Sequence, residues 1–340
     1  MMVRPNYAYT ASIMIVSFNT RELLRECLDS LIAECGRLGE GRNAEILVVD
    51  NASRDGSADM VERDYGQAPI TVRLFRSTVN LGFGAANNVA MDAADGHYIV
   101  LLNSDAFLHQ GALNKAIDQI EKQPKAGVGG ARLVCGDGSW QPSARGFHTL
   151  WRDALVMTGL ADRFPKSRIF GAPSRTWADP AKAAQVDWVT GAFMILRREA
   201  LAVTGIFDPA FFLYCEEVDL CRRIQQAGFE VWYWPDVFVT HLGGESSKQV
   251  SEQHFSNVNA QIELWRIRSW LLYYRKHHGR KAWMALWLER SFFWLRRQRN
   301  RMSSIPWRKA RAAEADLVLE LLRKAWQDTD GGRTSPPRPW

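Results

Sequence analysis

The sequence lacks the segments that carry a chain into or across a membrane. No stretch of its 340 residues comes near the roughly 18 uncharged residues that a membrane-spanning helix needs. The first ten residues contain Arg4 but no apolar core of a secretion signal before Ile13. We therefore expect a cytoplasmic protein without a transmembrane anchor.

Cysteine is scarce and has no regular spacing. The chain has five cysteines, an odd number, and no C-x-x-C pair. This pattern argues against a disulfide framework and against a structural zinc site. It suits free thiols in a reducing compartment, which agrees with a cytoplasmic location.

Positive charge is concentrated in one segment. The net charge is +6, but residues 266–311 contain 14 Lys and Arg and a single acid, Glu289, so the rest of the chain is mildly acidic. This change marks a boundary near residue 255. It predicts a body over residues 1–254, a helical C-terminal extension over 255–327 and a disordered tail over 328–340, which is rich in Gly, Pro and Arg.

Aromatic residues alternate with the cations of this extension. Helices with an aromatic face and a basic face lie along anionic membrane surfaces, which predicts peripheral membrane contact through residues 265–311. In the alternative, the aromatics pack on the body or on a partner subunit. No nucleic-acid-binding motif accompanies the charge, so we expect no nucleic-acid partner.

Short apolar segments alternate with helical periodicity in the first 110 residues. The expected strands cover residues 12–18, 45–50, 71–75 and 98–102, and helices are expected over 21–31 and 85–94. Such alternation predicts an α/β fold with a mostly parallel central sheet, right-handed crossovers and flanking helices.

Small polar residues follow the expected strands. Because the carboxyl ends of parallel strands share one edge of a sheet, we expect these residues to converge on one pocket. They are Ser17, Asn19, Asp50, Asn51, Asn80, Gly82, Asn103 and Asp105. Asp105 follows the most apolar strand and is placed to hold a divalent cation or a ligand hydroxyl. Turn hydrogen bonds are the alternative role for residues 103–105.

Two common nucleotide-binding patterns are absent. Gly82 and Gly84 begin a G-x-G-x-x-G sequence that fails because position 87 is Asn, and no G-x-x-x-x-G-K-[ST] sequence occurs. The expected pocket is therefore neither a dinucleotide site nor a P-loop of the usual kind.

A series of motifs, in order along residues 11–280, resembles the family 2 glycosyltransferases and in particular their bacterial rhamnosyltransferase-like branch. The motifs are IVSFN (15–19), VVDNAS (48–53), NLGFGAAN (80–87), LNSD (102–105), TGAF (190–193), FD (207–208), FFLYCEEVDLC (211–221) and THLGGES (240–246). The resemblance implies a GT-A catalytic domain over 1–254, with a nucleotide-sugar half (11–110) and an acceptor half (111–254). It also implies inverting transfer of a sugar from a nucleotide diphosphate donor.

The resemblance also implies how the donor is held. Asp50 would contact its base or ribose, and Asp105 would ligate Mg²⁺ or Mn²⁺ between the phosphates. His241 would complete the metal or diphosphate contact. Residues 103–105 keep only the last acid of a D-x-D motif, so metal binding is expected to be weaker or supplemented. The nucleotide pocket would be lined by Ser17, Asn19, Asn51, Asn80, Gly82 and Asn103.

A catalytic base is expected among the acids that begin the segment at 216. Glu217 occupies the position of the family's catalytic Asp, and its longer side chain leaves Glu216 and Asp219 open as alternatives. These acids are expected in the first turn of a helix, where carboxylates also suit the helix dipole without any catalytic purpose.

Three further residues are candidates for phosphate or acceptor contact. Arg145 lies in a loop that resembles a family segment near the donor and could pair with a phosphate, unless it is a solvated surface arginine. Trp188 and Gly191 open a strand on the acceptor side, where the indole could stack on a sugar unless it is a core residue.

Two hypotheses of function follow. The first is an active, metal-assisted transferase that uses a sugar nucleotide such as dTDP-L-rhamnose. It would extend a lipid-linked or polysaccharide acceptor in cell-envelope glycan synthesis at the inner face of the membrane. The second is a non-catalytic GT-A module that binds a nucleotide sugar or glycan as a scaffold. Retention of Asp50, Asp105, Glu217 and His241 favours the first. The oligomeric state is left open, and a homo-oligomer is one alternative.

Overall fold

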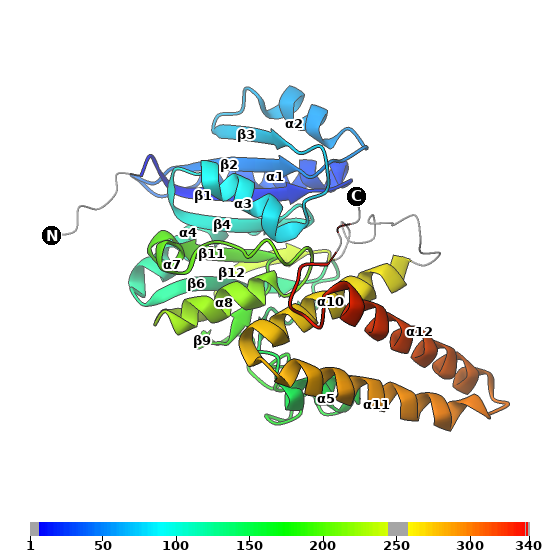
Figure 1. The fold of residues 1–340 in the computed structure, drawn as a ribbon. Coiled ribbons are helices and arrows are strands. Elements are labelled where there is room, and N and C mark those ends of the chain that lie inside the picture. The colour runs from blue at the N-terminus through cyan, green and yellow to red at the C-terminus, as the bar shows by residue number, and fades with distance from the viewer. Residues whose placement is uncertain (1–6, 244–257, 337, 339–340) are drawn as a thin grey trace.

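The computed structural model describes residues 7–243, 258–336 and 338. A ten-stranded sheet runs through the body, helices cover both of its faces, and three long helices extend from one side (Figure 1). This confirms the predicted α/β class and the helical C-terminal region. Residues 244–246 of the last motif and the boundary expected near 255 lie outside the described residues.

The sheet is mostly parallel on its N-terminal side. The strands β3, β2, β1 and β4 pair in parallel, and β11 joins β4 to β6 in antiparallel fashion. The order across the sheet is β3 (Thr71–Arg76), β2 (Ala44–Asp50), β1 (Tyr9–Ser17), β4 (Gly96–Asn103), β11 (Phe193–Arg197), β6 (Ala126–Val134), β12 (Glu230–His241) and β5 (Ala106–Leu108). The flanking short strands are β7 (Trp140–Gln141) on β6 and β9 (Ala184–Gln185) on β12, and a separate pair is β8 (Ala144–Arg145) with β10 (Trp188–Val189).

Strand pairing brings the predicted polar ends to one edge. Ser17 at the end of β1 lies opposite Asp50 at the end of β2, and Val16 lies opposite Asn103 at the end of β4. The four strands expected from apolar runs are all present. Their ends therefore converge as parallel strands require.

Alternate residues of the central strands supply two apolar cores. Ile13 and Ile15 pack with α1, α2 and α4 on one face, whereas Met14 packs with α3, α7, α8 and α10 on the other. The helices of the body are α1 (Arg21–Cys35), α2 (Ser57–Tyr65), α3 (Phe83–Ala93), α4 (Ala112–Lys122), α5 (Leu150–Met157), α6 (Leu160–Arg163), α7 (Arg198–Thr204) and α8 (Glu216–Gln226).

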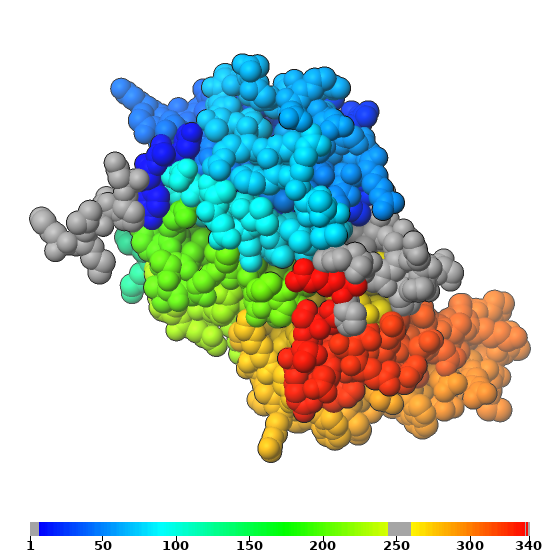
Figure 2. All heavy atoms as spheres, turned by 45° about the horizontal axis from the view of Figure 1, so that its top comes forward, coloured from blue at the N-terminus to red at the C-terminus, as the bar shows by residue number. Residues whose placement is uncertain are grey.

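The C-terminal helices differ in what their aromatic residues contact. These helices are α10 (Val258–His278), α11 (Lys281–Arg301) and α12 (Pro306–Asp328), and α11 and α12 form a hairpin that projects from the body (Figure 2). On α10, Trp265, Trp270 and Tyr274 are buried in the core, so the predicted membrane-facing role is wrong for this helix. On α11, Trp283 and Trp287 are each 59% exposed. None of the helices in the described parts of the chain combines the length and apolar character that crossing a membrane would take.

The expected disordered tail is also corrected. Residues 329–336 are placed, and Thr329 is fully buried. Its Oγ1 donates to the carbonyl of Ala325 at 2.7 Å and accepts from the backbone N–H of Gly332 at 3.0 Å. The glycines thus close the end of α12 in a turn, and Ser335 Oγ then donates to the carbonyl of Ala210 in the body.

The buried carboxylate of Asp219 links α8 to α10. Asp219 of α8 is fully buried and lies 2.7 Å from His277 Nε2 and 2.8 Å from Lys276 Nζ, both on α10, as well as 2.8 Å from Arg223 Nε of its own helix. Burial alone would raise the pKa of Asp219, but His277, Arg223 and Lys276 outweigh it and lower the pKa to about 2.

We expect Asp219→Ala to lower the free energy of unfolding by about 3–5 kcal/mol, because it leaves buried cations without their counter-charge. Since the folded pKa is depressed, the stability from Asp219 is present above its ordinary pKa of 3.8 and is lost as pH falls toward about 2. Urea unfolding of both proteins across this pH window measures the difference. Asp92→Ala, at an exposed site on α3, is the control. A loss equal to that of the control, or one that persists below pH 2, would contradict the account.

Candidate functional site

A cavity of about 260 Å³ opens where the central strands end, and we call it the strand-edge cavity. Six of the predicted site residues line it, namely Asn51, Asn80, Gly82, Asn103, Asp105 and His241. The other lining residues are Val16, Phe18, Phe83, Ser104, Phe212, Leu213 and Tyr214. The polar residues that follow separate strands therefore meet at one concave site.

Three residues predicted at the strand ends, Asp50, Ser17 and Asn19, do not line this cavity. Ser17 is fully buried, and its hydroxyl lies 3.1 Å from that of Thr20, which in turn lies 3.0 Å from Ser104 Oγ. Asn19, at a φ of 52°, accepts the backbone N–H of Arg54 at 2.7 Å and so holds the loop after β2. The side chains of Ser17 and Asn19 are used within the fold, so the expectation that they line the pocket is wrong.

Asp50 has one carboxylate oxygen without a protein partner. The residue is 5% exposed, and Oδ2 accepts the backbone N–H of Ser53 at 3.1 Å. Oδ1 is buried and has no hydrogen bond to any described residue. Burial raises the pKa of Asp50, and the Ser53 hydrogen bonds offset part of that rise. A buried acceptor left in this way is suited to a donor group of a bound ligand.

The asparagines of the site hold its glycine turn. Asn51 Nδ2 donates to Asn80 Oδ1 at 2.8 Å, and Asn80 Oδ1 also accepts the N–H of Gly82 at 2.9 Å. Gly82 has φ 82° and ψ 177°, a conformation open to glycine alone, and a Cβ there would lie 2.1 Å from the carbonyl oxygen of Phe212. The glycine thus lets the loop before α8 close over the cavity.

Asp105 and His241 lie next to each other in the same cavity. His241 Nδ1 donates to Gln141 Oε1 at 2.8 Å, which leaves Nε2 as the acceptor nitrogen. His241 Nε2 lies 3.4 Å from Asp105 Oδ1 and accepts from Asn103 Nδ2 at 3.3 Å. A carboxylate oxygen and an imidazole nitrogen suit a divalent cation. Within the described residues, no group of three or more His, Cys, Asp or Glu side chains gathers at this or any other site.

Glu216 and Glu217 begin α8, as predicted, after a turn in which Tyr214 and Cys215 both have positive φ. Glu216 is 3% exposed and faces α3, where a Cβ on Gly84 would lie 3.5 Å from its own Cβ. Burial and the charge of Glu217 raise the pKa of Glu216 well above its usual range. Burial therefore favours the neutral form of Glu216.

Glu217 is the more accessible of the two acids. Burial raises its pKa, while N–H groups of its own backbone, Arg145, His148 and the Gly191 backbone lower it in part. Its Oε2 has no hydrogen bond to any described residue. A carboxylate of raised pKa with an unpaired oxygen is suited to accept a proton.

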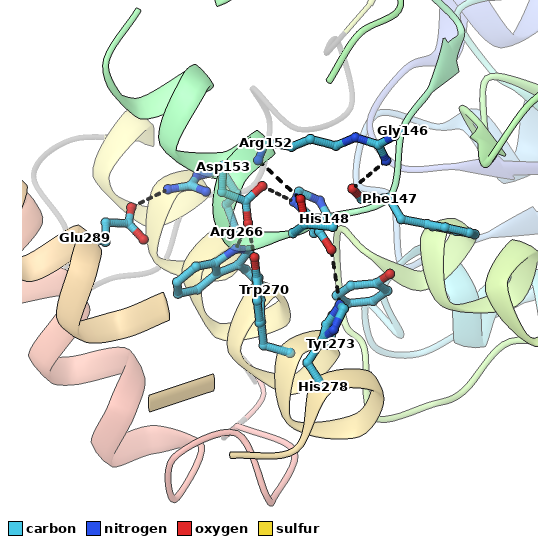
Figure 3. Close-up of polar contacts among 12 residues, drawn as sticks. Gly146, Phe147, His148, Arg152, Asp153, Arg266, Trp270, Tyr273, His278 and Glu289 are labelled. Atoms are coloured by element: carbon cyan, nitrogen blue, oxygen red, sulfur yellow. Dashed lines mark hydrogen bonds and ion pairs between the residues drawn. The ribbon is translucent and has the colours of Figure 1, made fainter. Parts of the chain in front are cut away.

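A second cavity of about 390 Å³, which we call the interhelix cavity, lies between residues 145–157 and the helices α10 and α11. Arg145 and Trp188 line it, and Trp188 Nε1 donates to the carbonyl of Gly146 at 2.9 Å. Asp153 also lines this cavity, and its Oδ2 accepts from Trp270 Nε1 at 2.9 Å and from the Tyr274 hydroxyl at 2.6 Å. Figure 3 shows Asp153 and Trp270 side by side. Arg145 is not among the residues that line the strand-edge cavity, so its place differs from the donor-side loop that the resemblance suggests.

Glu217 is not among the residues that line either cavity, but groups beside each of them act on it, namely Arg145 and the Gly191 backbone. Phe83 lines the strand-edge cavity, and a Cβ on Gly191 would lie 3.1 Å from its ring. Arg145 lines the interhelix cavity and acts electrostatically on Glu217. Glu217 therefore has a neighbouring group beside each cavity.

The third acid of the motif has another use. Asp219 is fully buried and paired with His277, Lys276 and Arg223, so it is not available to a ligand, which corrects its candidacy. Sequence reasoning missed Gln141, whose role depends on a contact across the sheet. It also missed the interhelix cavity, because nothing in the sequence shows that α10 and α11 close it.

Comparison with known proteins gives evidence on the family of this chain that does not depend on the geometry of the site. The sequence profile of the family described as "Glycosyl transferase family 2" matches residues 12–202. The chain is 29% identical over 230 residues to N-acetylglucosaminyl-diphospho-decaprenol L-rhamnosyltransferase of Mycobacterium tuberculosis, covering 64% of this chain and 73% of that protein. It is 25% identical over 260 residues to rhamnosyltransferase WbbL of Escherichia coli K12, covering 72% of this chain and 87% of that protein.

Solved structures share the fold. GalNAc-T7 with UDP, GalNAc and Mn²⁺ aligns with a TM-score of 0.56 at 16% identity, over 79% of this chain and 51% of that one. The mannosyltransferase PcManGT from Pyrobaculum calidifontis, in complex with GDP-Man and Mn²⁺, aligns with a TM-score of 0.51 at 17% identity, over 96% of this chain and 76% of that one. Both are similar to this chain in their fold.

We expect Gly82→Ala to destabilise the chain more than Gly138→Ala, although both glycines have a φ near 80°. An added Cβ at Gly138 meets nothing within 4 Å, so only backbone strain of about 1 kcal/mol applies. At Gly82 the contact with the Phe212 carbonyl adds to the strain, and the loss should reach about 3 kcal/mol or more. Urea unfolding measures both variants. Equal losses would mean that the loop before α8 does not press on Gly82.

Proposed function

The chain belongs to glycosyl transferase family 2 and is a glycosyltransferase, and we propose that it transfers L-rhamnose from dTDP-L-rhamnose to a lipid-linked acceptor. The reaction would be one step in cell-envelope glycan synthesis, with inversion at the transferred sugar. The names of two relatives support the transferred sugar and the acceptor class, since both are rhamnosyltransferases and one is named for a diphospho-decaprenol acceptor. Such an acceptor would place the enzyme at the inner face of the cell membrane.

The observation that carries the proposal is that Asp105 and His241 meet in the strand-edge cavity, while the acid Glu217 lies next to Arg145, which lines the interhelix cavity. The strand-edge cavity offers Asp105 and His241 for a diphosphate and Asp50 nearby, with an unpaired oxygen for the base or ribose. The interhelix cavity offers room for a second substrate. A transfer between the two substrates requires a base beside the acceptor, and Glu217 lies next to a residue of the interhelix cavity.

Asp105 and His241 would hold the divalent cation of this reaction, and the Mn²⁺ named in both solved structures supports this. A bound Mg²⁺ or Mn²⁺ supplies positive charge that stabilises the departing diphosphate. The protein offers two ligands in the described residues, so donor phosphates would provide others. Gln141 fixes the imidazole with Nε2 directed to the site.

Glu217 would take the proton of the acceptor hydroxyl. As the hydroxyl oxygen forms a bond to the anomeric carbon, the bond from that carbon to the diphosphate breaks, and the proton moves to Glu217. A single displacement inverts the anomeric centre. Burial favours the neutral form of Glu216 beside it, which limits the repulsion between the two acids when Glu217 is ionised.

We expect the Glu217→Gln variant to bind the donor normally. Its kcat should fall by about 10²-fold to 10⁴-fold, because the amide cannot accept the proton. Calorimetry with UDP-, dTDP- and GDP-sugars in the presence of Mn²⁺ measures binding, and turnover is measured with a polyprenyl-diphosphate acceptor. Glu40→Gln, at an exposed position, is the control and should retain wild-type activity.

Near-normal turnover of Glu217→Gln would remove Glu217 as the base. If the wild-type chain binds a sugar nucleotide but transfers sugar to no acceptor, the alternative is favoured, a GT-A scaffold that binds nucleotide sugar or glycan without catalysis. If it binds no sugar nucleotide at all, the proposed donor site is wrong.

We expect Gln141→Leu to weaken Mn²⁺ binding in the presence of dTDP by about 10–100-fold, because the imidazole of His241 loses the acceptor that orients it. Electron paramagnetic resonance of free Mn²⁺ during titration measures the affinity without any turnover. Gln67→Leu, at an exposed position in the loop before β3, is the control. Unchanged affinity in Gln141→Leu would show that His241 does not bind the cation.

A further inference from the structure

An apolar groove adjoins the interhelix cavity at the surface. It has a volume of about 340 Å³ and is lined by Leu150 at the start of α5 and by Trp283, Met284, Trp287 and Leu288 of α11, and we call it the α5–α11 groove. Leu150 and Leu288 also line the interhelix cavity, so the two spaces share a wall. The groove therefore adjoins the cavity across these two side chains.

Large apolar side chains are exposed together in the groove. Trp283 and Trp287 are each 59% exposed and Met284 is 49% exposed, and all three lie on adjacent turns of one helix. Their side chains are not part of the apolar core. The buried aromatic residues nearby are Trp265 and Tyr274 of α10. Clustered apolar side chains of this kind mark a binding surface.

The interhelix cavity carries positive charge. Arg145 is mostly buried beside the Trp188 ring, 5.7 Å from its centroid, and makes no ion pair with any described carboxylate. The Nε of this arginine has no hydrogen bond to any described residue. By contrast, Arg152 is paired with Asp187 and Arg266 with Glu263. Arg145 is thus a cation near Glu217 that an anionic ligand group would match.

The order of these features matches the order of groups in an amphiphile. Glu217 comes first, Arg145 follows in the interhelix cavity, and the apolar groove lies beyond Leu150 and Leu288. A sugar hydroxyl at the base, a phosphate at the arginine and a hydrocarbon chain in the groove would satisfy all three.

Resting on the proposed function, we propose that the α5–α11 groove binds the hydrocarbon chain of the lipid-linked acceptor, with Arg145 facing its phosphate. The contact of the groove with the cavity beside the base favours this occupant over bulk membrane lipid. A membrane surface would need exposed aromatics but no adjoining cavity near Glu217. The groove would then set the preference for long-chain acceptors.

The test compares two acceptors that differ in their chain alone. Both carry N-acetylglucosamine diphosphate, one on a decaprenyl chain and the other on a short, water-soluble prenyl chain, and both are assayed in the same detergent. The variant is Trp287→Ser, which changes an exposed side chain and leaves the core intact. Trp307→Ser is the matched control, since Trp307 is 53% exposed at the start of α12 and lies outside the groove.

We expect Trp287→Ser to raise KM for the decaprenyl acceptor by about 10-fold, the usual scale for loss of an aromatic anchor, with kcat and the short-chain KM unchanged. Trp307→Ser should change neither. The proposal is overturned if Trp287→Ser raises KM equally for both acceptors. It is also overturned if Trp307→Ser has the same effect, which would indicate general adsorption to the detergent or membrane surface.

A binding measurement separates this proposal from the proposed function. A decaprenyl diphosphate that carries a benzophenone on its chain is photo-crosslinked to the wild-type protein, and the site is mapped by mass spectrometry. Attachment at Met284 or Trp287 supports the groove even if the enzyme transfers no rhamnose. Attachment elsewhere, or none, overturns the groove even if the transferase activity is confirmed.

Discussion

The contact of Asp219 with Lys276 and His277 joins the helix that begins at Glu216 to a helix that lines the interhelix cavity. It fixes α8 against α10 through a carboxylate with no solvent exposure. Glu217 lies two residues earlier on the same helix and is affected by Arg145, which lines the interhelix cavity. Because α10 also forms a wall of the interhelix cavity, the base and that cavity are linked through the same ion pairs.

The site retains buried acids that cost stability. Asp50, Glu216 and Glu217 each have a carboxylate oxygen that is buried without a partner among the described residues. Burial raises the pKa of all three. Unpaired buried carboxylates are unfavourable in a folded chain, which favours a functional purpose for these three over a structural one. In contrast, Asp219 is fully paired and serves the fold.

Much of the body could be predicted from the sequence, because apolar runs that end in small polar residues specify buried parallel strands. The convergence of Asn51, Asn103 and Asp105 followed from that pattern alone. The pattern could not show which polar side chains turn inward, and Ser17 and Asn19 are used within the fold. The residues that line the cavity and those that are used within the fold are of the same small polar types, and only their contacts differ.

The C-terminal helices were harder to interpret for a similar reason. Both α10 and α11 alternate aromatic and basic residues, so the sequence gives them one character. Packing separates them, since Trp270 is buried against the body whereas Trp287 is exposed. The turn after α12 was also misread, because Gly331 and Gly332 resemble a flexible tail but close the helix through Thr329.

The most direct test of the central claim, that Glu217 joins two substrate sites, is a crystal structure of the Glu217→Gln variant. The crystals would contain Mn²⁺, a dTDP-sugar and a short-chain diphosphate acceptor. The account predicts the nucleotide in the strand-edge cavity and the acceptor in the interhelix cavity. The reacting hydroxyl should lie within about 3 Å of the substituted side chain. An acceptor bound outside the interhelix cavity, or a hydroxyl that approaches Glu216 instead, would contradict it.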